Sequence, residues 1–401
     1  MTIAPKIAKP LPVPNGDFYG IAESLAPDEL AVVKKVRDFM ETKVAPVIGK
    51  YWADDAFPFE LVAPFKELGI GGLGLAGYGC AGGSQKLFGC VAMEMARVDP
   101  SFCTFFGVHD GLAMGSIALD GSEEQKRKWL PAMARMDVIG CFGLTEPLVG
   151  SGAAGGLTTT AQRDGDGWIL NGQKMWIGNS PWCDVSIIWA RDVADNQVKG
   201  FIIENKSTPG FAVEKIEHKM ALKVVQNGLI TMKDCRVAEA NRLQGGNSFK
   251  DTARVLRMTR YMVGWASTGC QMGAYENALA YTQKRKQFGK PIASFQLVQD
   301  LLAKMLGNLT ACQCLMMRLA ELDDQGRMLD HHAALAKSFG TAKMRETVAW
   351  ARELCGANGI VIDNNVGKFF CDAEALYSYE GTYQMQNLII GKAVTGLSAF
   401  V

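Results

Sequence analysis

The sequence lacks an excess of charge of either sign and any long apolar run. Lys and Arg number 42 against 41 Asp and Glu, which gives a formal net charge of +1. A nucleic-acid-binding protein needs a clear excess or cluster of positive charge, so we exclude that class. No uninterrupted apolar run reaches the roughly 18 residues of a membrane-spanning helix. We therefore expect no membrane span.

Metal-binding and hydrolase patterns are also missing. The four histidines do not have the spacing of a zinc site or of a His-Glu-x-x-His helix, so we expect no metal. No Gly-x-Ser-x-Gly elbow follows a predicted strand, although a dispersed catalytic triad stays open. The 11 cysteines are odd in number and contain no Cys-x-x-Cys pair, which indicates reduced thiols in a reducing compartment.

The two ends of the chain carry no pattern typical of a targeting signal. Met1–Gly16 contains four prolines, no Arg and no long apolar stretch, unlike a secretory signal or a mitochondrial presequence. The last residues are Ser398–Val401, which do not resemble a peroxisomal Ser-Lys-Leu signal. On these grounds we expect a cytoplasmic protein.

Glycine, by contrast, is abundant, with 44 residues against 14 prolines, which predicts tight turns and close backbone approaches. Gly69-x-Gly71-x-x-Gly74 has the spacing of the dinucleotide-binding fingerprint. That fingerprint works only between a strand and a helix. Here a helical pattern precedes it and no helix start follows, so we interpret it as a glycine-rich surface loop.

Hydrophobic periodicity divides the chain into three parts. Apolar residues recur every three or four positions in Asp28–Val44, and this pattern predicts helices over 28–134. The middle has short β-branched and aromatic segments between turn residues, which predicts an antiparallel sheet of hairpins. Long helical patterns return from Ser248 and predict a bundle. The predicted strands are Trp168–Lys174, Val185–Ala190, Gly200–Glu204 and Leu229–Met232, and the long helices are Ser248–Lys284, Ser294–Gln325 and Leu329–Leu354.

The predicted fold class is therefore α+β with several domains. We expect an N-terminal arm over 1–24, an α-helical domain over 25–140, a β-domain over 141–247 and a C-terminal helical bundle over 248–401. Within the first helical domain, Ser122 and Gln125 have the spacing of a capping box.

Three stretches carry the chemistry. Thr145–Gly152 joins the helical part to the β part, and its Pro147 and Gly150 present amides and hydroxyls to a ligand. Asn171–Ser180 contains a hairpin turn and then Trp176, for which core packing is the alternative. Tyr379–Thr382 places Glu380 just before the last helix, where the alternative is a plain helix cap on Thr382.

Together these stretches resemble the acyl-CoA dehydrogenase family. The resemblance extends to Arg285–Gly289 with Gln296, and to Glu353–Gly359, over about residues 25–398 in a consistent order. The glutaryl-CoA dehydrogenases and the plant short-chain acyl-CoA oxidases are the branches that this chain resembles most.

The resemblance implies an N-terminal α-domain, a middle β-domain and a C-terminal four-helix domain (the acyl-CoA dehydrogenase fold). It implies FAD bound between the last two domains and a neighbouring subunit, and hence a homo-oligomer, a tetramer or at least a dimer. The implied substrate is an acyl-CoA. The family's base is the Glu of Tyr-Glu-Gly-Thr, which is Glu380 here. The place where a minority of relatives carry that glutamate is Thr259, before Arg260.

The resemblance also assigns contacts residue by residue. Substrate contacts fall on Ser151, Arg260, Tyr379, Glu380 and Gly381. Contacts to the chain's own flavin fall on Phe142, Leu144, Thr145, Gly150, Ser151, Trp176, Ile177, Gly178, Thr382 and Gln384. Contacts to a neighbour's flavin fall on Arg285, Phe288, Gln296, Glu353, Gly356 and Ala357.

Three positions depart from the family pattern. Gly178 replaces the usual Thr after Trp-Ile, so a hydroxyl near the hydride-accepting flavin nitrogen is missing. Gly152 replaces the usual Asp, and Ala357 replaces the second Gly of Gly-Gly-Asn-Gly. The first departure bears on how the flavin is reoxidised.

Three functions stay open. The first is α,β-dehydrogenation of a short-chain acyl-CoA to a trans-2-enoyl-CoA, with electrons passed to an electron-transfer flavoprotein. The second is an oxidase that uses O₂ and releases H₂O₂, which Gly178 and Val225–Gly228 favour. The third is a flavin monooxygenase or a non-catalytic flavoprotein on the same fold. Glu380 argues against the third.

The substrate's chain length is predicted from one helix. In the glutaryl branch an Arg that binds the distal carboxylate stands where this chain has Cys103, and a Ser that shares the task aligns with Gly107. We therefore expect glutaryl-CoA to be excluded, because a buried unpaired carboxylate is costly. Phe102, Phe105 and Phe106 either pack in the core or shorten the acyl cavity.

Overall fold

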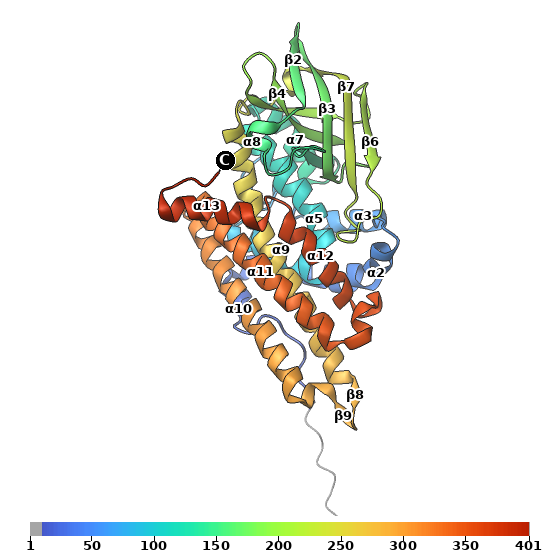
Figure 1. The fold of residues 1–401 in the computed structure, drawn as a ribbon. Helices are drawn as coiled ribbons and strands as arrows, with labels where there is room; N and C mark the ends of the chain where they lie inside the picture. Colours follow the sequence, from blue (N-terminus) through green and yellow to red (C-terminus); the bar gives the residue numbers. More distant parts are fainter. Residues whose placement is uncertain (1–9, 401) are drawn as a thin grey trace, which may run out of the picture.

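The structure is a computed structural model that describes residues 10–400, so residues 1–9 of the predicted arm and Val401 lie outside the described residues. It contains a helical part, a sheet and a second helical part in chain order (Figure 1). The fold predicted from the sequence is confirmed. The N-terminal helices are α1 Pro27–Phe39, α2 Ala45–Ala53, α3 Val62–Lys66, α4 Gln85–Val98, α5 Pro100–Gly107, α6 Gly115–Asp120 and α7 Glu123–Ala134.

Short polar side chains start the N-terminal helices. Ser84 accepts the N–H of Leu87 at the start of α4, and Asp99 accepts the N–H of Phe102 at the start of α5. Ser122 and Gln125 form the predicted capping box on α7. Each cap satisfies an N–H that the first turn of a helix leaves without a partner.

The stretch Pro100–Asp120 runs through α5, a π-helical segment (Val108–Met114) and α6. Its mean hydropathy of 1.3 and its length would suit a membrane span, but 78% of it is buried inside the protein. It is the central helix of the N-terminal part. Burial against neighbouring helices accounts for its apolar composition.

The glycine-rich stretch after α3 differs from the predicted surface loop. Gly71 and Gly72 are buried, and a Cβ on Gly71 would lie 2.0 Å from the carbonyl oxygen of Ala134. The buried Asp110 accepts the N–H of Gly72. No strand precedes this stretch in the described chain, so the dinucleotide-binding interpretation is correctly excluded. Its glycines are there for close packing.

The middle part forms one seven-stranded sheet with the order β1-β4-β2-β3-β7-β6, and β5 pairs with β4. Most pairs are antiparallel, as predicted, but β4 runs parallel to both β1 and β2. Local hairpin signals do not predict these pairs, because the strands are distant in sequence. The strands are β1 Gly140–Gly143, β2 Thr160–Asp164, β3 Gly167–Gly178, β4 Val185–Asp192, β5 Val198–Glu204, β6 Phe211–Lys215 and β7 Asn227–Ala238, with a short helix α8 Ala153–Gly156.

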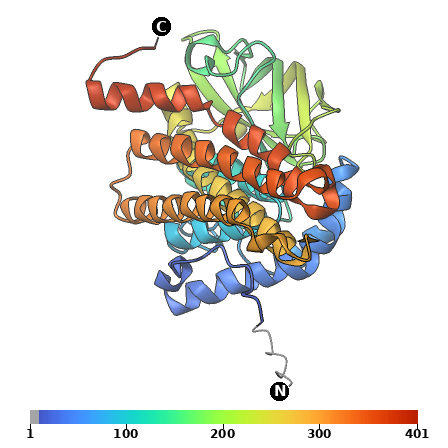
Figure 2. The same cartoon turned by 60° about the horizontal axis from the view of Figure 1, so that its bottom comes forward.

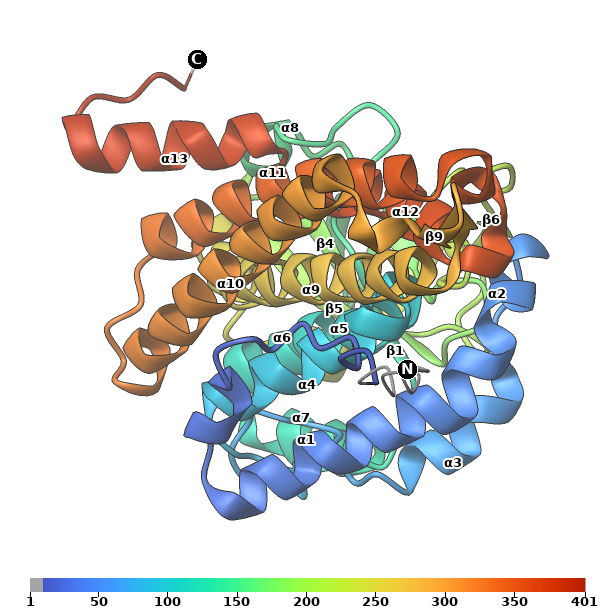
Figure 3. The ribbon, with the colours of Figure 1, turned by 90° about the horizontal axis from the view of Figure 1, so that it is seen from below.

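The C-terminal part is a bundle of long helices below the sheet (Figures 1 and 2). The predicted breaks near Gly289 and at Gly326 both occur, the first as a two-residue hairpin. The last helix, α13, packs beside α11 and then projects from the body (Figure 3). The elements are α9 Phe249–Lys284, β8 Lys286–Gln287, β9 Lys290–Pro291, α10 Gln296–Asp324, α11 Asp330–Leu354, α12 Val366–Ser378 and α13 Tyr383–Thr395.

Glycines let α9 approach α4 closely. A Cβ on Gly269 would lie 2.2 Å from the backbone oxygen of Met93 and 2.8 Å from the Cβ of Ala96. Backbone cannot move aside as a flexible side chain does. The α4–α9 contact therefore joins the N-terminal helices to the bundle at a distance that only glycine permits.

We expect Gly269→Ala to lower the free energy of unfolding by about 1–3 kcal/mol or more, because the added methyl forces α4 and α9 apart. The matched control is Gly307→Ala on α10, where a Cβ meets nothing within 4 Å. That change should be neutral or stabilising by up to about 1 kcal/mol. Denaturant unfolding of the FAD-loaded variants checks both. Equal stabilities would contradict this view of the contact.

Candidate active site

The loop Tyr379–Gly381 joins α12 to α13 and carries Glu380 into the protein. Thr382 caps α13 by accepting the N–H of Met385 at 3.3 Å, so the capping interpretation holds for Thr382. Glu380 is not part of this cap, and its Oε2 accepts a hydrogen bond from the hydroxyl of Thr259 on α9 at 3.0 Å. Its backbone φ is +55°, a strained conformation for a residue other than glycine. Such strain is typical of functional sites.

Opposing effects set the charge of Glu380. Burial raises the pKa of its carboxyl group, because a charged form is disfavoured away from water. The Thr259 hydroxyl and the cations of Arg260 and Lys337 lower that pKa and favour the ionised form. Arg260 itself is buried enough that its pKa is lowered, and its Nε has no partner in the described chain. The site therefore holds a dry carboxylate beside two cations.

Tyr379 extends the site toward α5. Its hydroxyl lies 3.4 Å from the hydroxyl of Thr104, and burial raises the pKa of the phenol. Thr104 is thus the residue of α5 that meets the loop carrying Glu380. It stands beside Cys103, whose thiol donates to the carbonyl of Ala92 at 3.4 Å.

The three phenylalanines of α5 belong to an aromatic cluster on the other side of that helix. Phe102, Phe105 and Phe106 are fully buried, and all three pack against the ring of Phe65 of α3 in edge-on or tilted geometry. Phe105 also contacts Trp182. Core packing accounts for these rings, so they give no support to a shortened acyl cavity.

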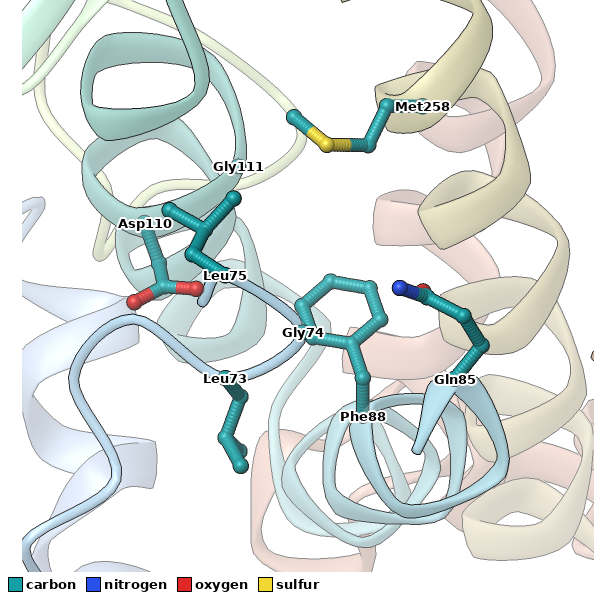
Figure 4. Close-up of a pocket in the computed structure, with 8 residues that line it drawn as sticks. All are labelled: Leu73, Gly74, Leu75, Gln85, Phe88, Asp110, Gly111 and Met258. Atoms are coloured by element: carbon teal, nitrogen blue, oxygen red, sulfur yellow. The ribbon is translucent and has the colours of Figure 1, made fainter. Parts of the chain in front are cut away.

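A small cavity lies between α4, α9 and the π-helical segment (Figure 4). Its volume is about 10 Å³, roughly the space for one water molecule. Met258 reaches over it from α9, Phe88 and Gln85 border it from α4, and Asp110 borders it from the π-helical segment. Burial raises the pKa of Asp110 to about 8. Thr259, Arg260 and Glu380 do not line this cavity, so it is separate from the site.

The first two predicted motifs meet where the segment after β1 lies beside β3. The hydroxyl of Thr145 donates to the carbonyl of Met175 at 2.6 Å, and the N–H of Met175 donates to the carbonyl of Thr145 at 2.8 Å. A buried ion pair braces this junction, because Lys174 Nζ binds Glu146 Oε1 at 2.8 Å and the carbonyl of Leu144 at 3.0 Å. The two motifs therefore form one surface.

Trp176 lies on this surface and not in the core, so the packing interpretation is wrong. Its side chain is 56% exposed and its φ is +68°. A strained backbone that presents an indole ring to the outside suits stacking against a flat ligand. Ile177 and Gly178 follow it and are buried, and a Cβ on Gly178 would lie 3.1 Å from Val108.

The residues on this surface fit the isoalloxazine ring of FAD. Phe142 and Leu144 are buried beneath it, while Gly150 and Ser151 are exposed. A Cβ on Gly150 would meet nothing within 4 Å, so the backbone there is open to a ligand. The exposed indole, the open backbone and the nearby hydroxyl of Thr145 together supply a stacking face and hydrogen-bonding groups. Thr382 and Gln384 stand at the start of α13, just after the loop that carries Glu380.

The residues predicted to bind a neighbour's flavin gather at the other end of α9. Arg285 lies about 38 Å along the helix from Arg260 at 1.5 Å per residue, and Arg260 is close to the loop that carries Glu380. Arg285 borders an open cavity of about 380 Å³ together with Asn358, which follows Glu353, Gly356 and Ala357. Phe288 is 92% exposed on the β8–β9 hairpin, and Gln296 begins α10. The geometry separates the two predicted groups of flavin contacts.

Two residues of the site were missed by the sequence reasoning. Lys337 on α11 and Gln386 on α13 are fully buried, and both donate to carbonyls of the loop that carries Glu380. A signal existed for Lys337, because it stands among the apolar residues Ala333, Ala334 and Ala336 on the buried face of its helix. A lysine at such a place needs partners inside the protein.

Family models for the acyl-CoA dehydrogenase N-terminal, middle and C-terminal domains match residues 26–137, 141–235 and 246–395. An acyl-CoA dehydrogenase of Bacillus subtilis is 32% identical over 92% of this chain and 98% of its own length. The subunit CarC of the caffeyl-CoA reductase-Etf complex of Acetobacterium woodii is 32% identical over 89% of this chain and 95% of its own length.

The fold is also similar to that of a solved structure with its cofactor. A glutaryl-CoA dehydrogenase of Mycobacterium smegmatis in complex with FADH2 has a TM-score of 0.93 and 34% identity, and it covers 97% of this chain and 100% of its own. The motifs, the three-part fold and these matches agree over nearly the whole chain. The chain belongs to the acyl-CoA dehydrogenase family and is a FAD-dependent oxidoreductase.

Proposed function

We propose that the protein converts a short-chain acyl-CoA to the trans-2-enoyl-CoA, with Glu380 as the base, and passes the electrons to an electron-transfer flavoprotein. The observation that carries this proposal is the half-buried Glu380, whose carboxylate accepts the hydroxyl of Thr259 and lies close enough to Arg260 to feel its charge. The α-C–H bond breaks and its proton goes to Glu380. The β-hydride leaves with its electron pair, and the double bond forms between the two carbons. Bound FAD supplies the hydride acceptor.

Desolvation makes Glu380 a suitable base for a weakly acidic α-proton. A carboxylate with a raised pKa binds a proton more strongly than one in water. The developing enolate needs hydrogen bonds at the thioester oxygen. We assign one of them to the backbone N–H of Glu380, so that one residue supplies both the base and a donor. Because burial raises the pKa of Glu380, the rate should rise with pH as the carboxyl group loses its proton in the complex.

We expect Glu380→Gln to retain FAD and bind an acyl-CoA but lose turnover by at least about 10²–10⁴-fold, because the amide cannot accept the α-proton. Anaerobic bleaching of the flavin by butyryl-CoA measures the step directly. Thr395→Val on the exposed end of α13 is a control that should bleach like the wild type. A variant at Glu380 that kept more than about a tenth of the rate would show that another group is the base.

The acyl group should be short and should lack a distal carboxylate. Cys103 faces the carbonyl of Ala92 and cannot pair a carboxylate as an Arg fork does. With the phenylalanines of α5 packed in the core, the short chain stays a prediction for the acyl-CoA series to test.

Steady-state kinetics with an acyl-CoA series checks these two arguments separately. We expect kcat/KM to be higher for butyryl-CoA than for glutaryl-CoA, because no arginine replaces Cys103 to pair the second carboxylate. We also expect it to be lower for palmitoyl-CoA, as the proposed preference for a short acyl chain requires. A preference for glutaryl-CoA contradicts the first argument, and a preference for palmitoyl-CoA contradicts the second.

The electron acceptor has two candidates. The relative CarC belongs to a complex named for an Etf component, which supports an electron-transfer flavoprotein here. Gly178 supports the oxidase, because the usual hydroxyl is missing beside the flavin position. Val108 at 3.1 Å, Val225 at 3.5 Å and the side-chain amide of Asn227 at 3.8 Å surround the position of a Cβ at Gly178. We favour the flavoprotein acceptor.

Hydrogen peroxide release in air with butyryl-CoA distinguishes the two acceptors. We expect slow release compared with turnover in the presence of an electron-transfer flavoprotein, because the proposed acceptor, and not O₂, reoxidises the flavin efficiently. Peroxide formed at the full rate of turnover would make the protein an oxidase.

The predicted oligomer is part of the same proposal. Arg285, Phe288 and Gln296 lie too far along α9 and α10 to reach the flavin surface of their own chain. A second copy brings them to a flavin if the contact is reciprocal, as in a twofold-symmetric dimer. The proposed assembly is a homotetramer, or at least a dimer.

A further inference from the structure

Two fully buried side chains bind three consecutive carbonyls of the loop that carries Glu380. Lys337 Nζ on α11 donates to the carbonyl of Tyr379 at 2.7 Å and to that of Gly381. Gln386 Nε2 on α13 donates to the carbonyl of Glu380 at 3.0 Å and to that of Gly381 at 2.9 Å. No other loop in the described chain has three successive carbonyls bound by two buried side chains in this way.

The hydrogen bond to Tyr379 fixes the direction of an N–H. In a planar trans peptide the C=O of one residue and the N–H of the next point in opposite directions. With the Tyr379 carbonyl turned to Lys337, the Glu380 N–H points away from α11. Within residues 10–400 no acceptor binds this N–H. It is therefore free to donate to a ligand on the side of the loop away from Lys337.

We infer that Lys337 is a positioning residue, which turns the backbone N–H of Glu380 toward the thioester oxygen by binding the carbonyls on either side of it. The inference rests on the proposed function, in which that N–H stabilises the enolate. The ammonium group also withdraws charge from the Tyr379 carbonyl, which makes the next N–H a stronger donor. Lys337 touches no reacting atom.

The backbone of the loop needs such support. Glu380 and Gly381 have φ values of +55° and +79°, in the left-handed region. A residue with a Cβ is strained in that conformation and holds it only when its surroundings impose it. Here Lys337 and Gln386 each donate to two carbonyls of the loop, and these four hydrogen bonds impose the left-handed conformation. The same bonds satisfy the ammonium group, which burial would otherwise make costly.

Lys337 also acts on the charge of Glu380. Burial lowers the pKa of Lys337 to about 7, and attraction to Glu380 opposes that shift. The other charged group that faces both is Arg260 of α9, which itself faces Asp330 and Arg257. The protonated ammonium stabilises the ionised Glu380 and so lowers its pKa. Removing the cation leaves Arg260 alone, and the pKa of Glu380 should rise.

The test compares Lys337→Met with Gln386→Met, each as the FAD-loaded protein. Anaerobic flavin reduction by butyryl-CoA should slow by about 10- to 100-fold in Lys337→Met, with a larger change in kcat than in KM. The rise of the rate with pH should move to higher pH, because Glu380 loses a neighbouring cation. Gln386→Met removes loop bonds without removing charge, so it should slow the reaction and leave the pH dependence in place.

Thr341→Val is the matched control on the same helix. Its hydroxyl donates to the carbonyl of Lys337 at 2.8 Å, so the change removes a buried hydrogen bond one turn away and keeps the ammonium group. It should leave both the rate and the pH dependence unchanged. Lys337→Met with the rate and pH dependence of the wild type overturns the inference. An equal loss in Thr341→Val also overturns it, because it would show a general effect on α11.

Hydrogen exchange of the peptide 379–386 without substrate separates this inference from the proposed function. Exchange should be faster in Lys337→Met and Gln386→Met than in the wild type and in Thr341→Val, because the loop loses its carbonyl partners. If exchange in Lys337→Met equals that in the wild type, the inference is overturned, even where no acyl-CoA reduces the wild-type flavin. A wild type that no acyl-CoA reduces contradicts the proposed function alone. If Lys337→Met fails to retain FAD, the same exchange comparison is made with Gln386→Met.

Discussion

The base at this site must be shielded from water and must also stay ionised, and these two requirements oppose each other. Burial makes Glu380 a stronger base, but it also favours the protonated form, which cannot accept an α-proton. Thr259 donates to the carboxylate at 3.0 Å, and the cations of Arg260 and Lys337 stand near it. The elements that carry these groups are α9 and α11. The packing of those two helices therefore decides whether the base works.

The rest of the fold holds those helices in place. The α9 helix packs against α4 so closely that Gly269 admits no side chain, and α11 packs beside α9 (Figures 1 and 3). The sheet closes one end of the bundle with the surface formed by Thr145 and Trp176. The far end of α9 carries Arg285, which suits a ligand of another chain. One long helix thus links the site of its own subunit to the proposed contact with a neighbour.

The motifs predicted the residues whose chemistry depends on their own side chains. Glu380 and Trp176 were assigned from the resemblance to a known family that short motifs carry, and both have a positive φ, a strained conformation for residues other than glycine. The periodic helices were also predicted well, because an apolar stripe is a local signal. The parallel pairs of β4 with β1 and β2 were missed, because such pairing joins strands that are distant in the chain.

Lys337 and Gln386 were missed for a different reason. Their partners are backbone carbonyls, which every residue has and which therefore leave no pattern in the sequence. Lys337 is also 42 residues from the Tyr379 carbonyl that it binds. The role of the α5 phenylalanines was open for a related reason: a stripe of rings predicts burial but not the side on which it packs. Only the contacts with Phe65 and Trp182 place them in the core.

A structure of the FAD-loaded protein with an unreactive acyl-CoA analogue tests the central claim most directly. The account predicts that the carbonyl oxygen of the analogue accepts the backbone N–H of Glu380, with the Glu380 carboxylate against the α-carbon and the flavin on the opposite face. The loop should keep its bonds to Lys337 and Gln386 in that complex. An acyl group bound away from Glu380, or a loop turned so that this N–H faces α11, would contradict the account.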